Sequence, residues 1–233
     1  MKLILLPGLD GTGELFQPLL DELPEYIETL VISYPNDRLL TYKELTDLVT
    51  SSLPQDEKFI LVAESFSGPI AYNIAQKKPK NLVSIIFVAT FLNNPRPFIS
   101  QLLVITPFKY IYNLRAPKFL LKYIFLNPNV NLSLLTKLKK ILNSIPSKII
   151  IHRIKQIITL KKPKIQIDMN VYYILAKKDK IISKKILESF RKSFNKVTIY
   201  TVNDGHLILQ SSPKECGNII MNILEKEQFT CQK

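Results

Sequence analysis

The chain of 233 residues has few of the residues on which several kinds of functional site depend. Its only two cysteines, Cys216 and Cys231, lie late in the chain and have no metal-like spacing. They offer neither a disulfide framework nor a thiolate site, so we expect a cytoplasmic protein with no bound metal. The first apolar run, LILL, is too short for a signal-peptide core or a transmembrane helix.

Acidic residues are missing from a long internal stretch. Residues 65–167 contain 17 lysines and arginines and no aspartate or glutamate, whereas the whole chain has a net charge of +13. One interpretation is compositional drift, since lysine, isoleucine and asparagine are all abundant. The other is an anionic partner, because a field of one sign attracts opposite charge. Nucleic acid, an anionic membrane surface and an acidic carrier protein would all fit.

Short apolar segments alternate with segments of helical periodicity, which predicts an α/β fold with a mostly parallel sheet of about six strands and crossover helices. The expected strands are Lys2–Leu6, Thr29–Ser33, Phe59–Ala63, Ser84–Ala89, Val171–Leu175 and Lys196–Val202. The expected helices lie near Glu14–Leu23, Tyr42–Leu53, Ser183–Phe194 and Pro213–Glu225.

The alternation stops in the middle of the chain. Residues 91–164 are rich in leucine, isoleucine and aromatic residues and are interrupted by prolines, which favours several short helices. We therefore predict that residues 1–90 and 165–233 form the α/β core and that residues 91–164 form a helical insertion.

The segment Phe59–Ser67, FILVAESFS, has the pattern of a nucleophile elbow. An apolar strand stops at Ser65, and a helical segment follows at once. Ala63 and Ser67 stand two positions either side of that serine, where only small residues let the strand and helix approach closely. Ser65 is the candidate nucleophile.

A serine nucleophile needs a general base, and the chain has only two histidines. His206 follows the last expected strand directly, in a loop that would project it from the sheet edge. His152 lies within the insertion, where a surface or structural role is the simpler interpretation. The sequence therefore favours His206 as the base.

The third group should be a carboxylate after a strand, between the serine and the histidine. Asp179 follows the strand VYYIL after a short loop and precedes a helix. Asp168 precedes that strand, at the wrong edge of a parallel sheet, and Asp204 is the second choice. The order Ser65, Asp179, His206 is the one associated with α/β-hydrolases. Asp179 would fix the tautomer of the histidine and stabilise its imidazolium form.

An oxyanion hole is also required, because negative charge develops on the carbonyl oxygen in the transition state. One donor would be the backbone N–H of Phe66, immediately after the nucleophile. The other would be that of Leu9, in the turn after the first strand, where Gly8 lets the backbone approach closely.

Two other kinds of site are disfavoured. The glycines at positions 8, 11 and 13 do not have the spacing of a dinucleotide-binding loop, and no G-K-[ST] sequence follows them. Clustered histidine, aspartate or cysteine ligands for a metal are lacking. A non-catalytic protein of the same fold stays open, although a binding module has no need of all three catalytic residues.

Four segments together resemble the α/β-hydrolase family over nearly the whole chain. LLPGLDGTG resembles the family's oxyanion segment, AESFSG its elbow, AKKDKII its acid loop and NDGHLILQSSP its histidine loop. Three residues depart from the family pattern: Pro7 replaces the usual histidine, and Ala63 and Ser67 replace the elbow glycines. The resemblance implies that the insertion is a cap, or lid, over the active site.

An apolar insertion with a basic surface also resembles the methyl ester esterases of biotin synthesis, which act on pimeloyl-acyl carrier protein methyl ester. That resemblance implies an acidic carrier protein as partner, a monomer without cofactor, and no nucleic-acid partner. The candidate carrier contacts are Arg96, Arg115, Lys118, Lys122, Lys137, Lys139, Lys140 and Arg153. A generalist carboxylesterase or thioesterase would share the same triad, and attachment of the basic helices to a membrane or nucleic acid is the alternative from another class.

Overall fold

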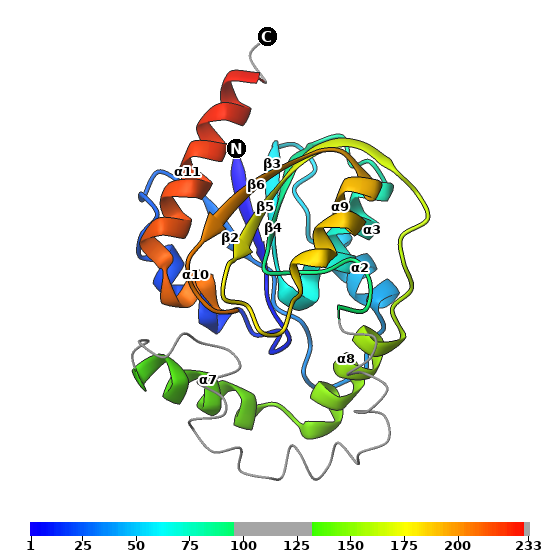
Figure 1. The fold of residues 1–233 in the computed structure, drawn as a ribbon, viewed down its shortest axis with the longest axis vertical. Coiled ribbons are helices and arrows are strands. Elements are labelled where there is room, and N and C mark those ends of the chain that lie inside the picture. Colours follow the sequence, from blue (N-terminus) through cyan, green and yellow to red (C-terminus); the bar gives the residue numbers. More distant parts are fainter. Residues whose placement is uncertain (96–131, 231–233) are drawn as a thin grey trace.

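The computed structural model describes residues 1–95 and 132–230 (Figure 1). Six strands form one sheet in the order β2-β1-β3-β4-β5-β6, and every neighbouring pair is parallel. The strands are β1 (Lys2–Leu6), β2 (Thr29–Val31), β3 (Phe59–Glu64), β4 (Leu82–Val88), β5 (Ile167–Ala176) and β6 (Phe194–Val202). The predicted six-stranded parallel sheet is confirmed.

Helices cover both faces of this sheet, as Figure 1 shows. One layer contains α2 (Tyr42–Ser51), α3 (Gly68–Gln76) and α9 (Leu187–Ser193), and the other contains α1 (Gln17–Leu20), α10 (Ile208–Ser211) and α11 (Pro213–Thr230). Because both faces of the central strands β1, β3 and β4 are buried, these strands read as nearly continuous apolar runs. In β3, Leu61 packs in the first layer and Ile60 and Val62 pack in the second.

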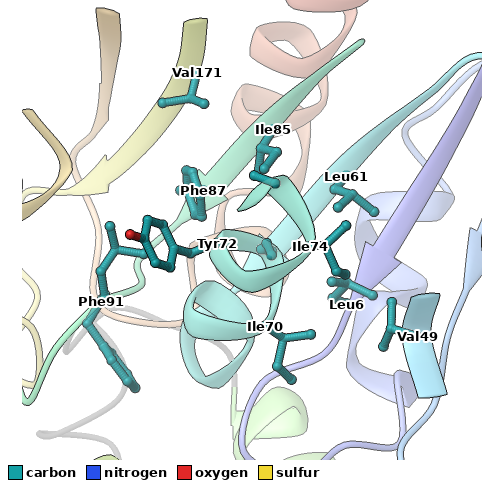
Figure 2. Close-up of a cluster of buried hydrophobic side chains, with 14 of the residues drawn as sticks. Leu6, Val49, Leu61, Ile70, Tyr72, Ile74, Ile85, Phe87, Phe91 and Val171 are labelled. Carbon is teal, nitrogen blue, oxygen red and sulfur yellow. The ribbon is translucent and has the colours of Figure 1, made fainter. Parts of the chain in front are cut away.

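The larger core cluster lies between the sheet and α2, α3 and α9. Figure 2 shows Ile70 and Ile74 of α3 in this cluster, together with Leu61 of β3 and Phe87 of β4. All four side chains are fully buried. The helix after Ser65 is therefore held firmly against the sheet, which fixes the start of that helix in place.

Local sequence signals explain where several helices begin and end. Thr41 caps α2: its hydroxyl accepts from the Glu44 N–H, and the Glu44 carboxylate accepts from the Thr41 N–H, so the predicted capping box is present. The helix expected near Glu14–Leu23 is shorter than predicted. A 3-10 turn (Glu14–Phe16) leads into α1, which ends at Leu20, ahead of Pro24.

Two helices of the insertion are described, α7 (Leu132–Ser144) and α8 (Ser147–Thr159), separated by Pro146. They lie beyond the carboxyl ends of the strands, apart from the two layers (Figure 1). Ile141 and Ile149 of these helices form a third cluster with Leu15 and Leu207 of the core. This part of the insertion is therefore attached to the loops at the carboxyl edge. In the described part of the chain, no helix combines the length and hydropathy needed to span a membrane.

Candidate active site

Four loops that carry the candidate catalytic residues leave the sheet at the same edge. The loops follow β1, β3, β5 and β6, and all these strands run in one direction. Carboxyl ends of parallel strands meet at one edge, which is where open α/β sheets place their ligands. The fold therefore brings together residues that are as far apart in sequence as Leu9 and His206.

Ser65 has the backbone conformation expected of a nucleophile elbow. It is the first residue after β3 and has φ of +45°, a left-handed value that a non-glycine residue adopts at a cost of about 1–3 kcal/mol. Immediately after it, a 3-10 turn (Ser65–Ser67) leads into α3. The sharp reversal leaves Ser65 half-buried at the end of the strand, while its neighbour Phe66 is fully buried.

The departures from the usual elbow glycines have a structural explanation. Ser67 has φ of −81°, which any residue can adopt, and its buried hydroxyl bonds to the Pro7 carbonyl and, at 2.5 Å, to the Tyr34 hydroxyl. The tight position is the next one, Gly68, where a Cβ atom would overlap Thr90. The close approach of α3 to the segment after β4 therefore depends on Gly68, and Ser67 instead bonds the elbow to the loop after β1.

The three predicted triad residues form one hydrogen-bonded chain. The Ser65 Oγ lies 2.9 Å from the His206 Nε2, and the His206 Nδ1 lies 2.7 Å from the Asp179 Oδ2. The other carboxylate oxygen of Asp179 accepts from the N–H groups of Ile181 and Ile182 at 2.7 and 2.8 Å. With Asp179 fixed in this way, the imidazole is oriented with one nitrogen facing the serine.

Burial and charge set the protonation states of this chain. Burial disfavours the imidazolium of His206, but the charge and hydrogen bond of Asp179, with the charge of Glu64, outweigh it and raise the pKa of His206. Burial also disfavours the Asp179 carboxylate, but the His206 charge and hydrogen bonds outweigh it and hold the pKa of Asp179 below its usual value. The pair can therefore accept a proton from a hydroxyl while the carboxylate stays ionised.

The predicted oxyanion donors lie beside this chain. A Cβ atom built on Gly8 would be 3.8 Å from the Ser65 Cβ, so the turn that carries Leu9 approaches the nucleophile closely. Within residues 1–95 and 132–230, no backbone acceptor is bonded to the N–H of Leu9 or Phe66. The role of both N–H groups as an oxyanion hole stays a prediction.

Asp168 and Asp204, the alternatives to Asp179, accept hydrogen bonds from groups other than His206. Asp168 lies near the amino end of β5, is exposed, and accepts a hydrogen bond from Asn195. Asp204 accepts from the Gly205 N–H and the Ser212 hydroxyl, at 2.7 and 2.8 Å. His152 lies in α8, 54 residues before His206 and within residues 91–164, as expected.

The predicted basic contacts divide into three groups. Lys137, Lys139 and Lys140 lie on α7, where Lys140 is exposed and the other two are half-buried. The candidates outside the described residues are Arg96, Arg115, Lys118 and Lys122. The prediction for Arg153 is wrong: its side chain is 3% exposed and bonds to three backbone carbonyls of the core, so it is not available to a partner.

Sequence reasoning missed a second buried carboxyl group next to the nucleophile. Glu64, the last residue of β3, is 3% exposed, and its Oε1 accepts from Gln210 Nε2 at 2.9 Å. Burial, aided by the charge of Asp10, raises the pKa of Glu64 to about 7, against the opposing effects of Gln210 and His206. The available signal was an acid at the end of an apolar strand, immediately before Ser65.

This carboxyl group should make stability fall with pH. The folded-state pKa of Glu64 lies above its ordinary value of 4.5, so the unfolded chain releases the proton first as pH rises. Between pH 4.5 and 7 the free energy of unfolding should therefore lose about 3 kcal/mol from this group. Glu64→Gln should remove that loss. We expect urea titrations at pH 5, 6, 7 and 8 to show the variant gaining stability relative to wild type, with exposed Glu25→Gln as control. Parallel curves for wild type and Glu64→Gln would contradict this.

No group of three or more histidine, cysteine, aspartate or glutamate side chains in the described ranges is arranged to hold a metal ion. The arrangement at the carboxyl edge is that of a nucleophile, a base and an orienting acid. Such a set can transfer an acyl group through a covalent intermediate without a cofactor.

Comparison of the chain with known proteins identifies the fold. No family model matches the sequence, and no curated protein matches it. Among solved structures, the chain is similar to a lipase-esterase related protein from Clostridium acetobutylicum, with 17% identity, a TM-score of 0.73, and coverage of 95% of this chain and 93% of that one. It is also similar to Est816, an N-acyl homoserine lactone degrading enzyme, with 13% identity, a TM-score of 0.77, and coverage of 95% and 92%.

A third similar structure is ClbQ from the colibactin NRPS/PKS pathway, with 13% identity, a TM-score of 0.71, and coverage of 98% of both chains. These likenesses span nearly all of each molecule, so they concern the whole architecture and not one motif. The chain has the α/β-hydrolase fold, as predicted.

Proposed function

We propose that this protein is a serine carboxylic ester hydrolase that works through an acyl-enzyme. The observation that carries the proposal is the chain from Ser65 through His206 to Asp179, with contacts of 2.9 and 2.7 Å, on an elbow whose serine has a positive φ. Solved structures with the same fold include a lipase-esterase related protein and a lactone-degrading enzyme, which is consistent with ester chemistry.

The proposed reaction has two acyl-transfer steps. The Oγ of Ser65 attacks the ester carbonyl while His206 Nε2 takes the proton of the serine hydroxyl. The backbone N–H groups of Leu9 and Phe66 stabilise the resulting oxyanion. The imidazolium then protonates the leaving alcohol, and the C–O bond of the ester breaks. Water attacks the acyl-enzyme with the same base, which returns free acid and Ser65. Asp179 stays ionised throughout and holds the imidazole.

A panel of esters tests the reaction class. We expect wild-type protein to hydrolyse carboxylic esters and to be labelled by a fluorophosphonate on the peptide that contains Ser65. Varying the acyl length, the head group and the leaving atom, oxygen or sulfur, separates a narrow esterase from a generalist carboxylesterase or a thioesterase. Absence of both turnover and labelling would favour the non-catalytic hydrolase-fold alternative and overturn the proposal.

Asp179→Asn should lower kcat about 10⁴-fold, because an amide in this position favours the wrong imidazole tautomer. It also removes the charge that raises the pKa of His206, so the acidic limb of the remaining pH–rate profile should move to lower pH. Stopped assays of kcat and kcat/KM across pH 5–9 measure both effects. Asp168→Asn, at the other edge of the sheet, is the matched control and should match wild type. An Asp179→Asn variant with wild-type kcat would exclude this acid.

For the substrate, we propose an acyl ester delivered by an acidic acyl carrier protein, with pimeloyl-acyl carrier protein methyl ester as the specific candidate. The support is the acid-free stretch 65–167 and the three lysines of α7, which lie on the insertion at the carboxyl edge. Charge of one sign accelerates the encounter with an acidic protein. Hydrolysis in the cytoplasm by a monomer is part of this proposal.

A triple substitution on α7 tests the carrier. Lys137→Gln, Lys139→Gln and Lys140→Gln together should raise KM for the carrier-linked ester and leave kcat/KM for the free methyl ester unchanged. The effect should shrink as salt rises, because exposed charges are screened within about 10 Å at 0.1 M. An equal response of both substrates, or none, would contradict the carrier. Vesicle and oligonucleotide binding to wild type at the same salt concentrations tests the membrane and nucleic-acid alternatives.

A further inference from the structure

Arg153 is a buried cation that joins the insertion to the core. It lies on α8, yet its Nη1 donates to the carbonyls of Leu9 and Asp10 at 2.9 and 2.8 Å, and its Nη2 donates to the carbonyl of Pro35 at 3.1 Å. Hydrogen bonds from a charged donor are roughly twice as strong as neutral ones. One side chain thus binds the loop after β1 and the loop after β2.

The guanidinium also lies against the elbow. The Cζ atom of Arg153 is 6.0 Å from the centre of the Phe66 ring and 5.9 Å from the centre of the Tyr34 ring, within the range of cation–π attraction. Phe66 stacks in turn on Tyr42, with ring centres 4.8 Å apart. The residue that follows the nucleophile therefore contacts both an aromatic ring and this cation.

The turn after β1 is shaped around the same group. Gly11 has φ of +70°, and a Cβ atom at that position would lie 2.6 Å from Arg153 Nη1. A side chain there would displace the guanidinium. Asp10, 4% exposed, supplies negative charge that favours the charged form of Arg153 against the effect of burial. The cation is accommodated by the turn and is not a chance contact.

These contacts converge on the two residues that carry the expected oxyanion donors, Leu9 and Phe66. We propose that Arg153 is a positioning residue: from the insertion, it fixes the turn after β1 beside Ser65 so that the Leu9 N–H and the Phe66 N–H point to one site. This inference rests on the proposed function. It adds that a residue of α8 contributes to the catalytic geometry.

The test compares Arg153→Met, Arg153→Lys and the control Lys155→Met, an exposed residue of the same helix. A displacement of the turn by about 1 Å should lower kcat about 10²-fold, with KM for a free ester changed little, because the oxyanion contact strengthens only in the transition state. Arg153→Lys keeps the charge but cannot reproduce the planar set of donors, so we expect partial rescue. Lys155→Met should match wild type.

Amide hydrogen exchange gives a readout that does not depend on turnover. Arg153→Met should accelerate exchange across residues 8–12 while the strands exchange as in wild type. Unchanged exchange in the turn, or a loss of kcat that follows only the fraction of unfolded protein, would overturn the positioning role. If Arg153→Met does not fold, the same comparison is made on Arg153→Lys. If wild type hydrolyses esters and Arg153→Met has the same kcat, this inference is refuted and the proposed function stands. If wild type hydrolyses no ester, the proposed function is refuted, and the hydrogen-exchange rates of residues 8–12 then decide whether Arg153 positions the turn.

Discussion

Ser65→Ala is expected to abolish ester turnover, with kcat falling about 10⁶-fold while the protein stays folded. The Oγ atom that lies 2.9 Å from His206 Nε2 is the only part removed, and without it no acyl-enzyme can form. The residual rate should remain some 10³-fold above that in water, because the oxyanion donors are still present.

Three measurements check this prediction. Pre-steady-state assays with excess ester should show no burst of the leaving alcohol, and intact-protein mass spectrometry should show no adduct with a fluorophosphonate. The thermal unfolding temperature should be unchanged or slightly higher, because alanine keeps the Cβ atom and loses only the half-buried hydroxyl group. Retained turnover in Ser65→Ala would refute the mechanism, since the Oγ of Ser65, 2.9 Å from His206 Nε2, is the nucleophile that the mechanism requires.

His206→Gln should have an effect of the same size, about 10⁶-fold in kcat, because a nucleophilic serine without its base is inactive. The chain supplies a matched control in its second histidine, since His152→Gln makes the same chemical change on α8. We expect that variant to retain at least half of wild-type kcat. The comparison is made at pH 8 with one ester. Equal losses in both variants would indicate a general effect on folding and would contradict the assignment.

The sheet and the triad could be predicted because local patterns identify the strands and the topology of a parallel sheet brings the loops after them together. A strand buried on both faces must be apolar throughout, and the loops that follow parallel strands must meet at one edge. With two histidines and no acid between Glu64 and Asp168, the choice of partners for Ser65 was small. Boundaries were less exact: β5 begins at Ile167 instead of Val171, because pairing with β6 extends its amino end.

The roles of Arg153 and Glu64 could not be predicted, because each depends on contacts between distant segments. Arg153 lies in a strongly basic stretch and was assigned to the surface with its neighbours, although its carbonyl partners lie more than 100 residues away. The raised pKa of Glu64 comes from burial under a helix that carries Gln210. Composition gives the number of charged side chains, but only the packed structure shows which of them are buried.

The bonds from Arg153 to the carbonyls of Leu9 and Asp10 have a consequence for protein engineering. Exchange of helical insertions between hydrolases is a direct way to transplant substrate preference, and it treats the insertion as an independent module. In this chain such an exchange would remove the hydrogen bonds that Arg153 donates to the loop after β1. A chimera of the strands and loops of this protein with a foreign insertion therefore needs an arginine placed on the incoming helix at the position of Arg153.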